Sequence, residues 1–284
     1  HIFRGGLFDL FSLMFLKMSG LKILLIVHDI ETIDTASFKS IKRIVLSNFH
    51  DAVVVHNHFS LEKIKEFTGT AVLRNAHVIP HGNYSHIQKK SCTREEALNY
   101  FRLDPSQRYL LFFGQIKETK GLDILLGALH LSKSNFKLII AGKLRIKNFD
   151  VYQKIIDRYL LQDRVIKTLR FITDEEATKL FSLSDAVVLP YRNIYQSGVL
   201  LLAMGFGKTV IASDLEPFKE IIEDGINGLL FENNNPESLA EIIDDVFSEK
   251  FNINLIETNA KQFAEKNFSW DNIAETFESI LRSR

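Results

Sequence analysis

The chain has 284 residues, of which 46% are hydrophobic and 25% charged, so it can build one large or two ordinary α/β domains. Lysine plus arginine and aspartate plus glutamate both number 35, and this balance gives no support to a nucleic-acid-binding protein. The only cysteine, Cys92, excludes an internal disulfide and indicates a reducing compartment. No apolar run reaches the 18 residues that a transmembrane helix needs.

The first 80 or so residues alternate between apolar helices and short apolar strands. This alternation predicts half of a doubly wound α/β domain with a parallel sheet. Two of the strands end directly in histidine-bearing turns. The expected helices are Leu7–Met18, Thr35–Phe49 and a helix capped by Ser60 and ending at Phe67, and the expected strands are Leu21–Val27, Ala52–Val55 and Val78–Ile79.

A polar segment, Ser85–Thr93, is the candidate linker to a second α/β region. Thr93 followed by Glu96 is a capping box, which predicts the first helix after the linker. Buried strands are expected at Leu110–Phe113, Leu138–Ala141, within Val165–Ile172, and at Ala186–Leu189, Val210–Ala212 and Gly228–Phe231. Helices are expected at Leu122–Leu131, Tyr152–Leu160, Asp174–Phe181, Val199–Phe206, Phe218–Glu223, Ser238–Phe247, Leu255–Asn267 and Trp270–Leu281.

The stretch from Asp185 to Asp214 predicts a strand, a polar turn, an apolar helix ended by Gly207 and a second strand. Gln196-Ser197-Gly198 stands where that helix begins. Small residues at a helix N-terminus let an anion approach the open N–H groups, and the helix dipole favours it. An ordinary strand-turn-helix without a ligand remains the alternative for this stretch.

A second candidate phosphate site is Gly114–Gly121, which follows a buried strand and contains Lys117 and Lys120. Close backbone approach and a nearby cation are what a phosphate needs. The stretch contains neither a P-loop nor a G-x-G-x-x-G fingerprint, and two solvated loop lysines are the alternative. Gly142-Lys143 follows the next strand and adds a third glycine-bearing strand end at the same edge.

His28 follows a buried strand, where an imidazole can donate to a sugar hydroxyl or a phosphate, or can simply pack in the domain. His56, His58 and His81 lie at other strand ends, but their spacings fit no zinc motif, so we expect no metal site. Ser197 lacks a G-x-S-x-G elbow and is not expected to be a nucleophile.

Six blocks in this order resemble the group 1, family 4 glycosyltransferases. They begin Phe112-Phe113-Gly114 (through Asp123), Phe171-Ile172 (through Glu176), Asp185 (through Tyr191), Gln196-Ser197-Gly198-Val199, Phe206-Gly207-Lys208 (through Asp214) and Glu220 (through Phe231). The resemblance implies an α/β GT-B fold, with two Rossmann-like doubly wound domains facing a cleft. It also implies a retaining, metal-independent enzyme.

The implied domains are a partial N-terminal acceptor-side domain at 1–88, a C-terminal nucleotide-sugar-binding domain at 89–268, and a helix at 269–284 that crosses back to the first domain. Family members begin with a strand and a glycine-rich loop that would precede His1. We therefore expect the N-terminal domain to be incomplete.

Carried over position by position, the resemblance implies catalytic roles for His28, Lys117 and Lys120, with His28 facing the donor sugar. The implied donor-binding residues are Gly114, Gln115, Gly142, Arg170, Phe171, Ile172, Tyr191, Gln196, Ser197, Gly198, Val199 and Glu220. Two residues depart from the family pattern. Gln115 replaces the usual arginine, and Leu202 stands where the family has the second of two paired glutamates.

The resemblance thus implies a cytoplasmic hexosyltransferase that needs no cofactor. It would move a sugar from a nucleotide diphosphate to a glycan or lipid-linked acceptor in surface-polysaccharide biosynthesis, with no nucleic acid and at most peripheral membrane contact. One alternative is a non-catalytic or split-enzyme nucleotide-sugar-binding module that needs a partner for the acceptor half. A sugar-nucleotide epimerase is a more distant alternative.

Overall fold

The computed structural model describes residues 7–28, 39–69, 75–84, 87 and 92–282. The chain forms two compact units. The first comprises 1–82 with 270–284, and the second comprises 83–269. Residue 35, where we expected a helix to begin, and most of the predicted linker 85–93 lie outside the described residues.

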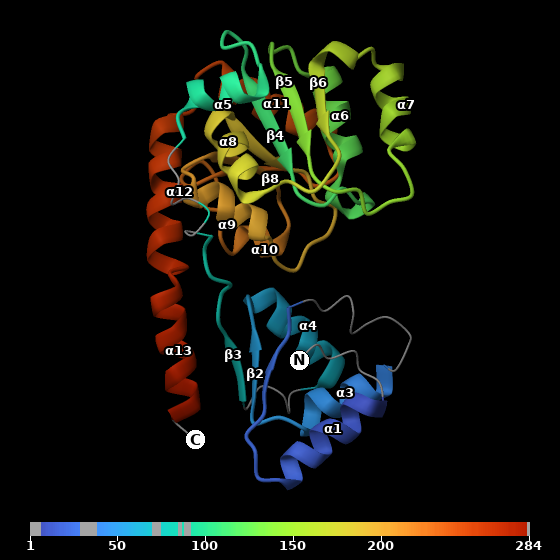
Figure 1. Ribbon diagram of the computed structural model, residues 1–284, viewed down its shortest axis with the longest axis vertical. Helices are drawn as coiled ribbons and strands as arrows, with labels where there is room; N and C mark the ends of the chain where they lie inside the picture. Colours follow the sequence, from blue (N-terminus) through green and yellow to red (C-terminus); the bar gives the residue numbers. More distant parts are fainter. Residues whose placement is uncertain (1–6, 29–38, 70–74, 85–86, 88–91, 283–284) are drawn as a thin grey trace. The chain divides into compact units, whose positions relative to one another are not determined.

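The second unit is built on a six-stranded, wholly parallel sheet in the order β6-β5-β4-β7-β8-β9 (Figure 1). Numbered along this unit alone, the order is 3-2-1-4-5-6, which is that of a dinucleotide-binding doubly wound sheet. The strands are β4 Tyr109–Phe113, β5 Lys137–Ala141, β6 Val165–Thr168, β7 Ala186–Leu189, β8 Thr209–Ser213 and β9 Leu229–Phe231.

Both faces of this sheet are buried, which explains why its strands are apolar without alternation. Leu110 and Phe112 of β4 pack in the cluster formed with α6, α7 and α11. Tyr109 and Leu111 pack in the cluster on the other face, with α5, α8, α9 and α12. The helices are α5 Arg94–Phe101, α6 Leu122–Leu131, α7 Asp150–Arg158, α8 Asp174–Leu183, α9 Gly198–Gly205, α10 Glu216–Lys219, α11 Pro236–Phe247 and α12 Ile253–Asn267.

The predicted capping box at Thr93 is confirmed. Its side chain accepts from the Glu96 N–H, and the Glu96 carboxylate accepts from the Thr93 N–H. The C-cap of α9 is Phe206, and the predicted glycine, Gly207, follows it with a left-handed φ of 61°. These local signals were readable because each rests on residues within one helical turn.

The first unit contains a three-stranded parallel sheet, β1-β2-β3, formed by Leu24–Ile26, Ala52–Val55 and Ala76–Val78. The predicted helix cap at Ser60 is wrong. Asn57 caps the helix instead, and its side chain accepts the Ser60 N–H at 2.7 Å. The helices of this unit are α1 Leu7–Met18, α3 Lys39–Asn48, α4 His58–Thr68 and α13 Trp270–Arg282.

The last helix, α13, packs in the first unit although it comes from the end of the chain. Ile273 and Ile280 share a buried cluster with Ala52, Val54 and Ile79. Two parallel sheets with helices confirm the predicted α/β class. Among the described residues, no helix is long and apolar enough to span a bilayer.

Candidate donor-phosphate site

The point where the strand order reverses lies between β4 and β7. The loop after β4 leads to α6, which packs on one face of the sheet, and the loop after β7 leads to α9, which packs on the other. In open parallel sheets, ligands bind outside the carboxyl ends of the strands at such a reversal. The two predicted phosphate-binding stretches, 114–121 and 190–199, are therefore the two loops that diverge there.

Glycines allow these loops to pack backbone against backbone. Gly114, Gly121 and Gly142 all have positive φ. A Cβ on Gly121 would lie 1.8 Å from the Pro190 carbonyl oxygen, and one on Gly142 would lie 1.6 Å from that of Gly114. The strand ends are thus drawn together at distances that no other residue permits.

The N-terminus of α9 presents open backbone donors. Ser197 caps the helix, and its hydroxyl accepts the Leu200 N–H at 3.2 Å. Within the described part of the chain, no group accepts a hydrogen bond from the N–H of Gly198 or Val199. Two unsatisfied N–H groups at the positive end of a helix dipole are suited to an anion. Gln196 precedes them, with its buried Oε1 unpaired among the described residues.

The β4 loop brings positive charge to the same region. Lys120 Nζ lies 3.4 Å from the centroid of the Tyr191 ring, so the two loops meet through a cation–π contact. Tyr191 is fully buried, and this burial raises the pKa of its phenol. Lys117 is the N-cap of the short 3-10 helix Glu118–Lys120.

An ion pair locks the two loops in place. The Arg192 guanidinium donates to both carboxylate oxygens of Asp123, at 2.6 and 2.5 Å. The Arg192 N–H also donates to the Thr119 carbonyl at 2.9 Å. The buried Thr119 Oγ1 has no hydrogen-bond partner among the described residues. The clamp holds the lysine-bearing loop against the turn that leads to α9.

Three of the predicted donor-binding residues, Arg170, Phe171 and Ile172, follow β6. Arg170 donates to both carboxylate oxygens of Glu176, and this pairing lowers the pKa of Glu176 to about 2. Phe171 is 71% exposed, whereas the Ile172 side chain is buried in the core. The Phe171 ring is therefore open to solvent, while Ile172 offers a ligand only its backbone.

Four further predicted residues take separate positions. Gln115 is exposed in the β4 loop, and Val199 has its Cγ2 at 3.3 Å from the place where a Gly114 Cβ would stand. Glu220 is exposed at the end of α10, on the loop after β8. His28 belongs to the first unit, where it follows β1.

Sequence reasoning missed Tyr84. A Cβ on Gly198 would lie 2.4 Å from the Tyr84 hydroxyl, so this phenol sits against the start of α9. Burial raises the Tyr84 pKa, which keeps the group neutral. No pattern in the chain predicts this contact, because Tyr84 is separated from Gly198 by more than one hundred residues of sequence. Arg192 was missed for the same reason, since its partner is Asp123.

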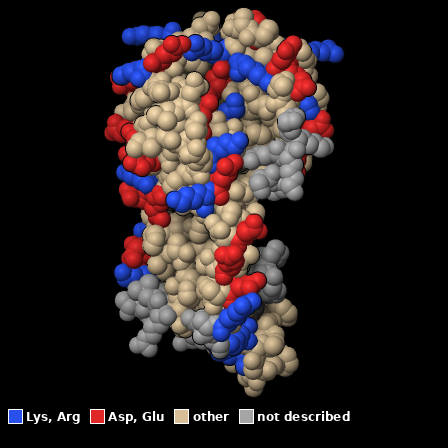
Figure 2. Space-filling view, turned by 90° about the vertical axis from the view of Figure 1, so that its left-hand side faces the viewer, with Lys and Arg blue, Asp and Glu red and all other residues tan. Residues whose placement is uncertain are grey.

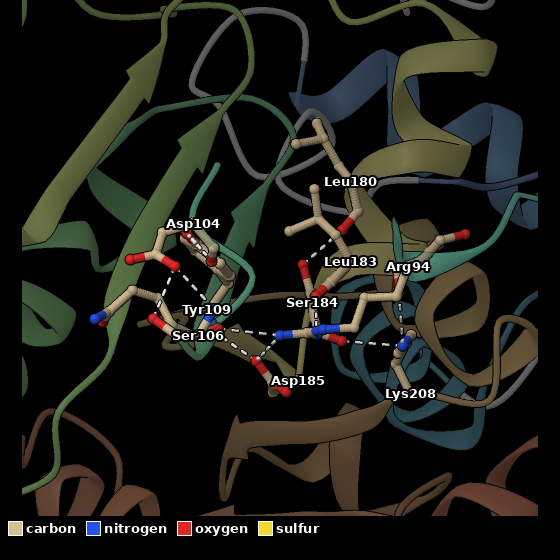
Figure 3. Close-up of polar contacts among 11 residues, drawn as sticks. Arg94, Asp104, Ser106, Tyr109, Leu180, Leu183, Ser184, Asp185 and Lys208 are labelled. Carbon is tan, nitrogen blue, oxygen red and sulfur yellow. Dashed lines mark hydrogen bonds and ion pairs between the residues drawn. The ribbon is translucent and has the colours of Figure 1, made fainter. Parts of the chain in front are cut away.

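The amino ends of the same strands carry a different kind of network (Figure 3). Asp185 Oδ2 accepts the Tyr109 N–H at 2.6 Å and an Arg94 N–H at 3.2 Å. Lys208 Nζ donates to the Ser184 carbonyl at 2.9 Å. These side chains bond to groups within the protein and so tie the amino ends of the strands together.

The charge of the surface is mixed. Figure 2 shows basic and acidic side chains interspersed over one face of the molecule, as the equal totals of 35 anticipate. Among the described residues there is no cluster of histidine, cysteine, aspartate or glutamate that could hold a metal ion.

Comparison with known proteins places these observations in a family. The model for "Glycosyl transferases group 1" matches residues 93–267. An uncharacterized glycosyltransferase of Methanocaldococcus jannaschii is 31% identical over 195 residues, which cover 66% of this chain and 49% of the relative. A lipopolysaccharide 1,2-N-acetylglucosaminetransferase of Salmonella typhimurium is 23% identical, with coverage of 72% and 56%.

Among solved structures, Anabaena HepE in complex with UDP aligns with a TM-score of 0.86 at 21% identity, covering 97% of this chain and 76% of that one. The likeness confirms the predicted GT-B fold class, with Rossmann-like units. The chain spans about half the length of the curated relatives it matches.

Proposed function

The chain belongs to the group 1 glycosyl transferases, and from this premise we propose that it transfers a sugar from a nucleotide diphosphate to an acceptor. The diphosphate binds in the second unit, at the reversal point between β4 and β7. The assignments of the base contact, the sugar contact and the acceptor are proposals that rest on this one.

The observation that carries the proposal is the open N-terminus of α9. The N–H groups of Gly198 and Val199 have no acceptor among the described residues, and Lys117 and Lys120 lie in the loop that meets this turn. A diphosphate leaving group gains negative charge in the transition state. Donors and cations that are already fixed in place stabilise that charge without reorganisation. This electrostatic role is the one we assign to α9 and the two lysines.

The other predicted site residues are proposed to hold the donor. Gly114, Gln115 and Gly142 would let the phosphates approach the strand ends, while the exposed Phe171 ring would lie against the base. Gln115 brings no charge to the loop where the family has arginine, so we assign that charge to Lys117. His28 is proposed to bind a sugar hydroxyl, and Glu220 is proposed to bind the donor from the β8 loop.

The finer identity of the reaction is also a proposal. We infer retention of configuration, hexosyl transfer without a metal ion, and a glycan or lipid-linked acceptor of a surface polysaccharide, at the cytoplasmic side of the membrane. The Salmonella relative acts, by its name, on lipopolysaccharide. The helix α1 exposes Phe8, Phe11 and Phe15 by 78%, 63% and 70%, which supports a peripheral contact with an apolar surface.

The test is binding followed by turnover. The thermal stability of the chain is measured with UDP, GDP, ADP, CMP and dTDP, and HepE makes UDP and UDP-glucose the first probes. Ligand at 100 times its dissociation constant adds about 2.7 kcal/mol to the stability. Sugar transfer is then measured with the matching nucleotide sugar and polysaccharide fragments.

The outcomes separate the candidate functions. A stabilising nucleotide together with transfer to an acceptor supports the transferase. Binding without transfer favours the alternative of a nucleotide-sugar-binding module that needs a partner. Conversion of the nucleotide sugar without any acceptor favours an epimerase. If a folded sample binds none of the five nucleotides, the proposed donor site is wrong.

A further inference from the structure

Three histidines follow the three strands of the first unit's sheet. His28 comes two residues after β1, His56 directly follows β2, and His81 comes three residues after β3. The His56 ring lies 4.7 Å from that of His28 and 5.8 Å from that of His81, measured between centroids. They are not a metal cluster by the geometry of the described residues. Two hydrogen bonds, one from His56 to the Ile79 carbonyl and one between His28 and His56, fix where the protons of His28 and His56 lie.

The chain of bonds begins at a backbone carbonyl. His56 Nδ1 lies 2.9 Å from the Ile79 carbonyl oxygen, which can only accept, so Nδ1 carries the proton and donates it. In the neutral ring, Nε2 of His56 is then an acceptor. His28 Nδ1 lies 2.9 Å from this Nε2, so His28 must donate through Nδ1–H. The hydrogen-bond network therefore assigns the Nδ1–H tautomer to both rings.

The electrostatic setting keeps both rings neutral. The pKa of His56 is lowered to about 4, chiefly by burial and also by the charges that His28 and His81 would carry. Burial and His81 also lower the pKa of His28. At neutral pH neither ring is protonated a second time. His28 therefore donates to His56, and His56 donates to the Ile79 carbonyl.

The Nε2 atom of His28 stands at the open end of this series of hydrogen bonds. The residue is exposed, and no group in the described ranges forms a hydrogen bond with this nitrogen. In the Nδ1–H tautomer Nε2 bears a lone pair and is an acceptor. It can receive the hydrogen of a hydroxyl group, but it cannot bond to a phosphate oxygen, which is also an acceptor.

We propose that His56 is a positioning residue that holds His28 in the Nδ1–H tautomer, so that His28 Nε2 accepts a hydrogen bond from a sugar hydroxyl. The identification of the ligand as a sugar rests on the proposed function, whereas the assignment of the tautomer does not. The sequence left two partners open for His28, a sugar hydroxyl and a phosphate. The Nδ1–H tautomer of His28 selects the hydroxyl. A site with a fixed acceptor discriminates against an analogue that lacks the hydroxyl.

The tautomers are measured directly by long-range proton–nitrogen NMR of the imidazole rings in the full chain at pH 7.5. We expect Nδ1 to be protonated in both His28 and His56, with the His28 signals assigned by their loss in His28→Gln. In His56→Leu the acceptor is gone, and His28 should shift toward the Nε2–H form that free imidazole side chains prefer. His130→Phe, in the second unit, should leave the His28 signals unchanged.

A conservative variant guards against misfolding. In His56→Gln the amide can donate to the Ile79 carbonyl and accept from His28, so the Nδ1–H form of His28 should be retained. The proposal is overturned if His28 is in the Nε2–H form in the wild-type chain. It is equally overturned if His56→Leu leaves the His28 tautomer unchanged.

The hydroxyl is tested by affinity with UDP and UDP-glucose. His28→Ala removes the acceptor, and His56→Leu changes the tautomer of His28. Either variant should weaken UDP-glucose binding about tenfold while UDP binding stays the same. His56→Gln should bind both probes like the wild-type chain. Unchanged UDP-glucose binding in His28→Ala overturns the hydroxyl role. If the wild-type chain does not bind UDP-glucose, both the sugar-hydroxyl contact of His28 and UDP-glucose as the donor are wrong. The NMR result still decides whether His56 sets the His28 tautomer.

Discussion

At the scale of single residues, the candidate site depends on glycines whose missing side chains set how closely two loops approach. The backbone of Gly121 packs directly against the Pro190 carbonyl, and that of Gly142 packs directly against the Gly114 carbonyl. The sequence shows glycines at three strand ends and so predicts open loops there. It does not show that these loops touch one another, because that contact depends on a strand order which one sequence does not reveal.

Replacing Gly121 by alanine should destabilise the second unit strongly. The new Cβ would stand 1.8 Å from the Pro190 carbonyl, and the φ of 63° adds the cost of a left-handed backbone. We expect a loss of roughly 3 kcal/mol or more in urea unfolding followed by circular dichroism. Gly225→Ala is the matched control: its φ is 75° but nothing lies within 4 Å, so about 1 kcal/mol is expected. Equal losses in the two variants would contradict this packing.

Lys120→Ala should weaken binding of a nucleoside diphosphate about 10- to 100-fold, because a charged hydrogen bond to a phosphate contributes about 1.5–3 kcal/mol. The control is Lys154→Ala, an exposed lysine on α7. Titration calorimetry with the nucleotide that stabilises the wild-type chain gives the two dissociation constants. The assignment of Lys120 to the diphosphate is wrong if both variants bind like the wild-type chain.

Acid should destabilise the first unit through His56. The folded-state pKa is lowered to about 4 from 6.5, so between these values the unfolded chain binds a proton that the folded chain does not. Stability is therefore complete above pH 6.5 and falls as the pH drops toward 4, by an amount on the order of 1 kcal/mol at pH 5 after allowance for solvent screening. Trp270, the only tryptophan, lies in this unit and reports its urea unfolding by fluorescence.

The control for this pH effect is His56→Gln, which cannot titrate. Its urea midpoint should change less between pH 7 and pH 5 than that of the wild-type chain. If the two proteins lose the same stability over this interval, His56 is not the group responsible.

At the scale of helices and strands, the elements that were predicted best are those with local signals. Thr93 and Glu96 lie in one turn, and so do Thr173 and Glu176, which form a second capping box. The cap at Ser60 was assigned wrongly because Asn57, three residues earlier, has an equally suitable side chain and two helical residues fit between them. Composition alone does not choose between two good caps.

The second capping box gives a prediction for α8. Thr173→Ala removes the acceptor of the Glu176 N–H and should reduce the free energy of unfolding of the second unit by about 1 kcal/mol. Thr173→Ser keeps a hydroxyl at the same position and should restore most of that loss. Urea unfolding followed by circular dichroism separates the two variants, and a serine variant as unstable as the alanine variant would argue against the cap.

At the scale of the whole molecule, alternation of strands and helices was enough to predict the α/β class, and block order was enough to indicate the GT-B fold. The strand order 3-2-1-4-5-6 of the second unit, in contrast, came only from the structure. It is this order that makes β4 and β7 neighbours and brings Lys120 to Tyr191. The clamp between Arg192 and Asp123 was out of reach for the same reason.

The second unit should fold without the first. All six strands of its sheet and both of its buried clusters come from residues 83–269. A chain of these residues should unfold cooperatively in urea and bind the stabilising nucleoside diphosphate with an affinity close to that of the full chain. A folded fragment that fails to bind would show that the proposed diphosphate site needs the rest of the protein.

The amino ends and the carboxyl ends of the central strands have different roles. At the amino ends, Asp185 and Lys208 tie β4, β7 and β8 together through backbone groups (Figure 3). At the carboxyl ends, the loops 114–121 and 190–199 contain donors without partners among the described residues. A laboratory-evolution library can therefore concentrate its diversity in these two loops, keep the glycines that let them meet, and leave unchanged the amino ends, whose side chains connect the strands.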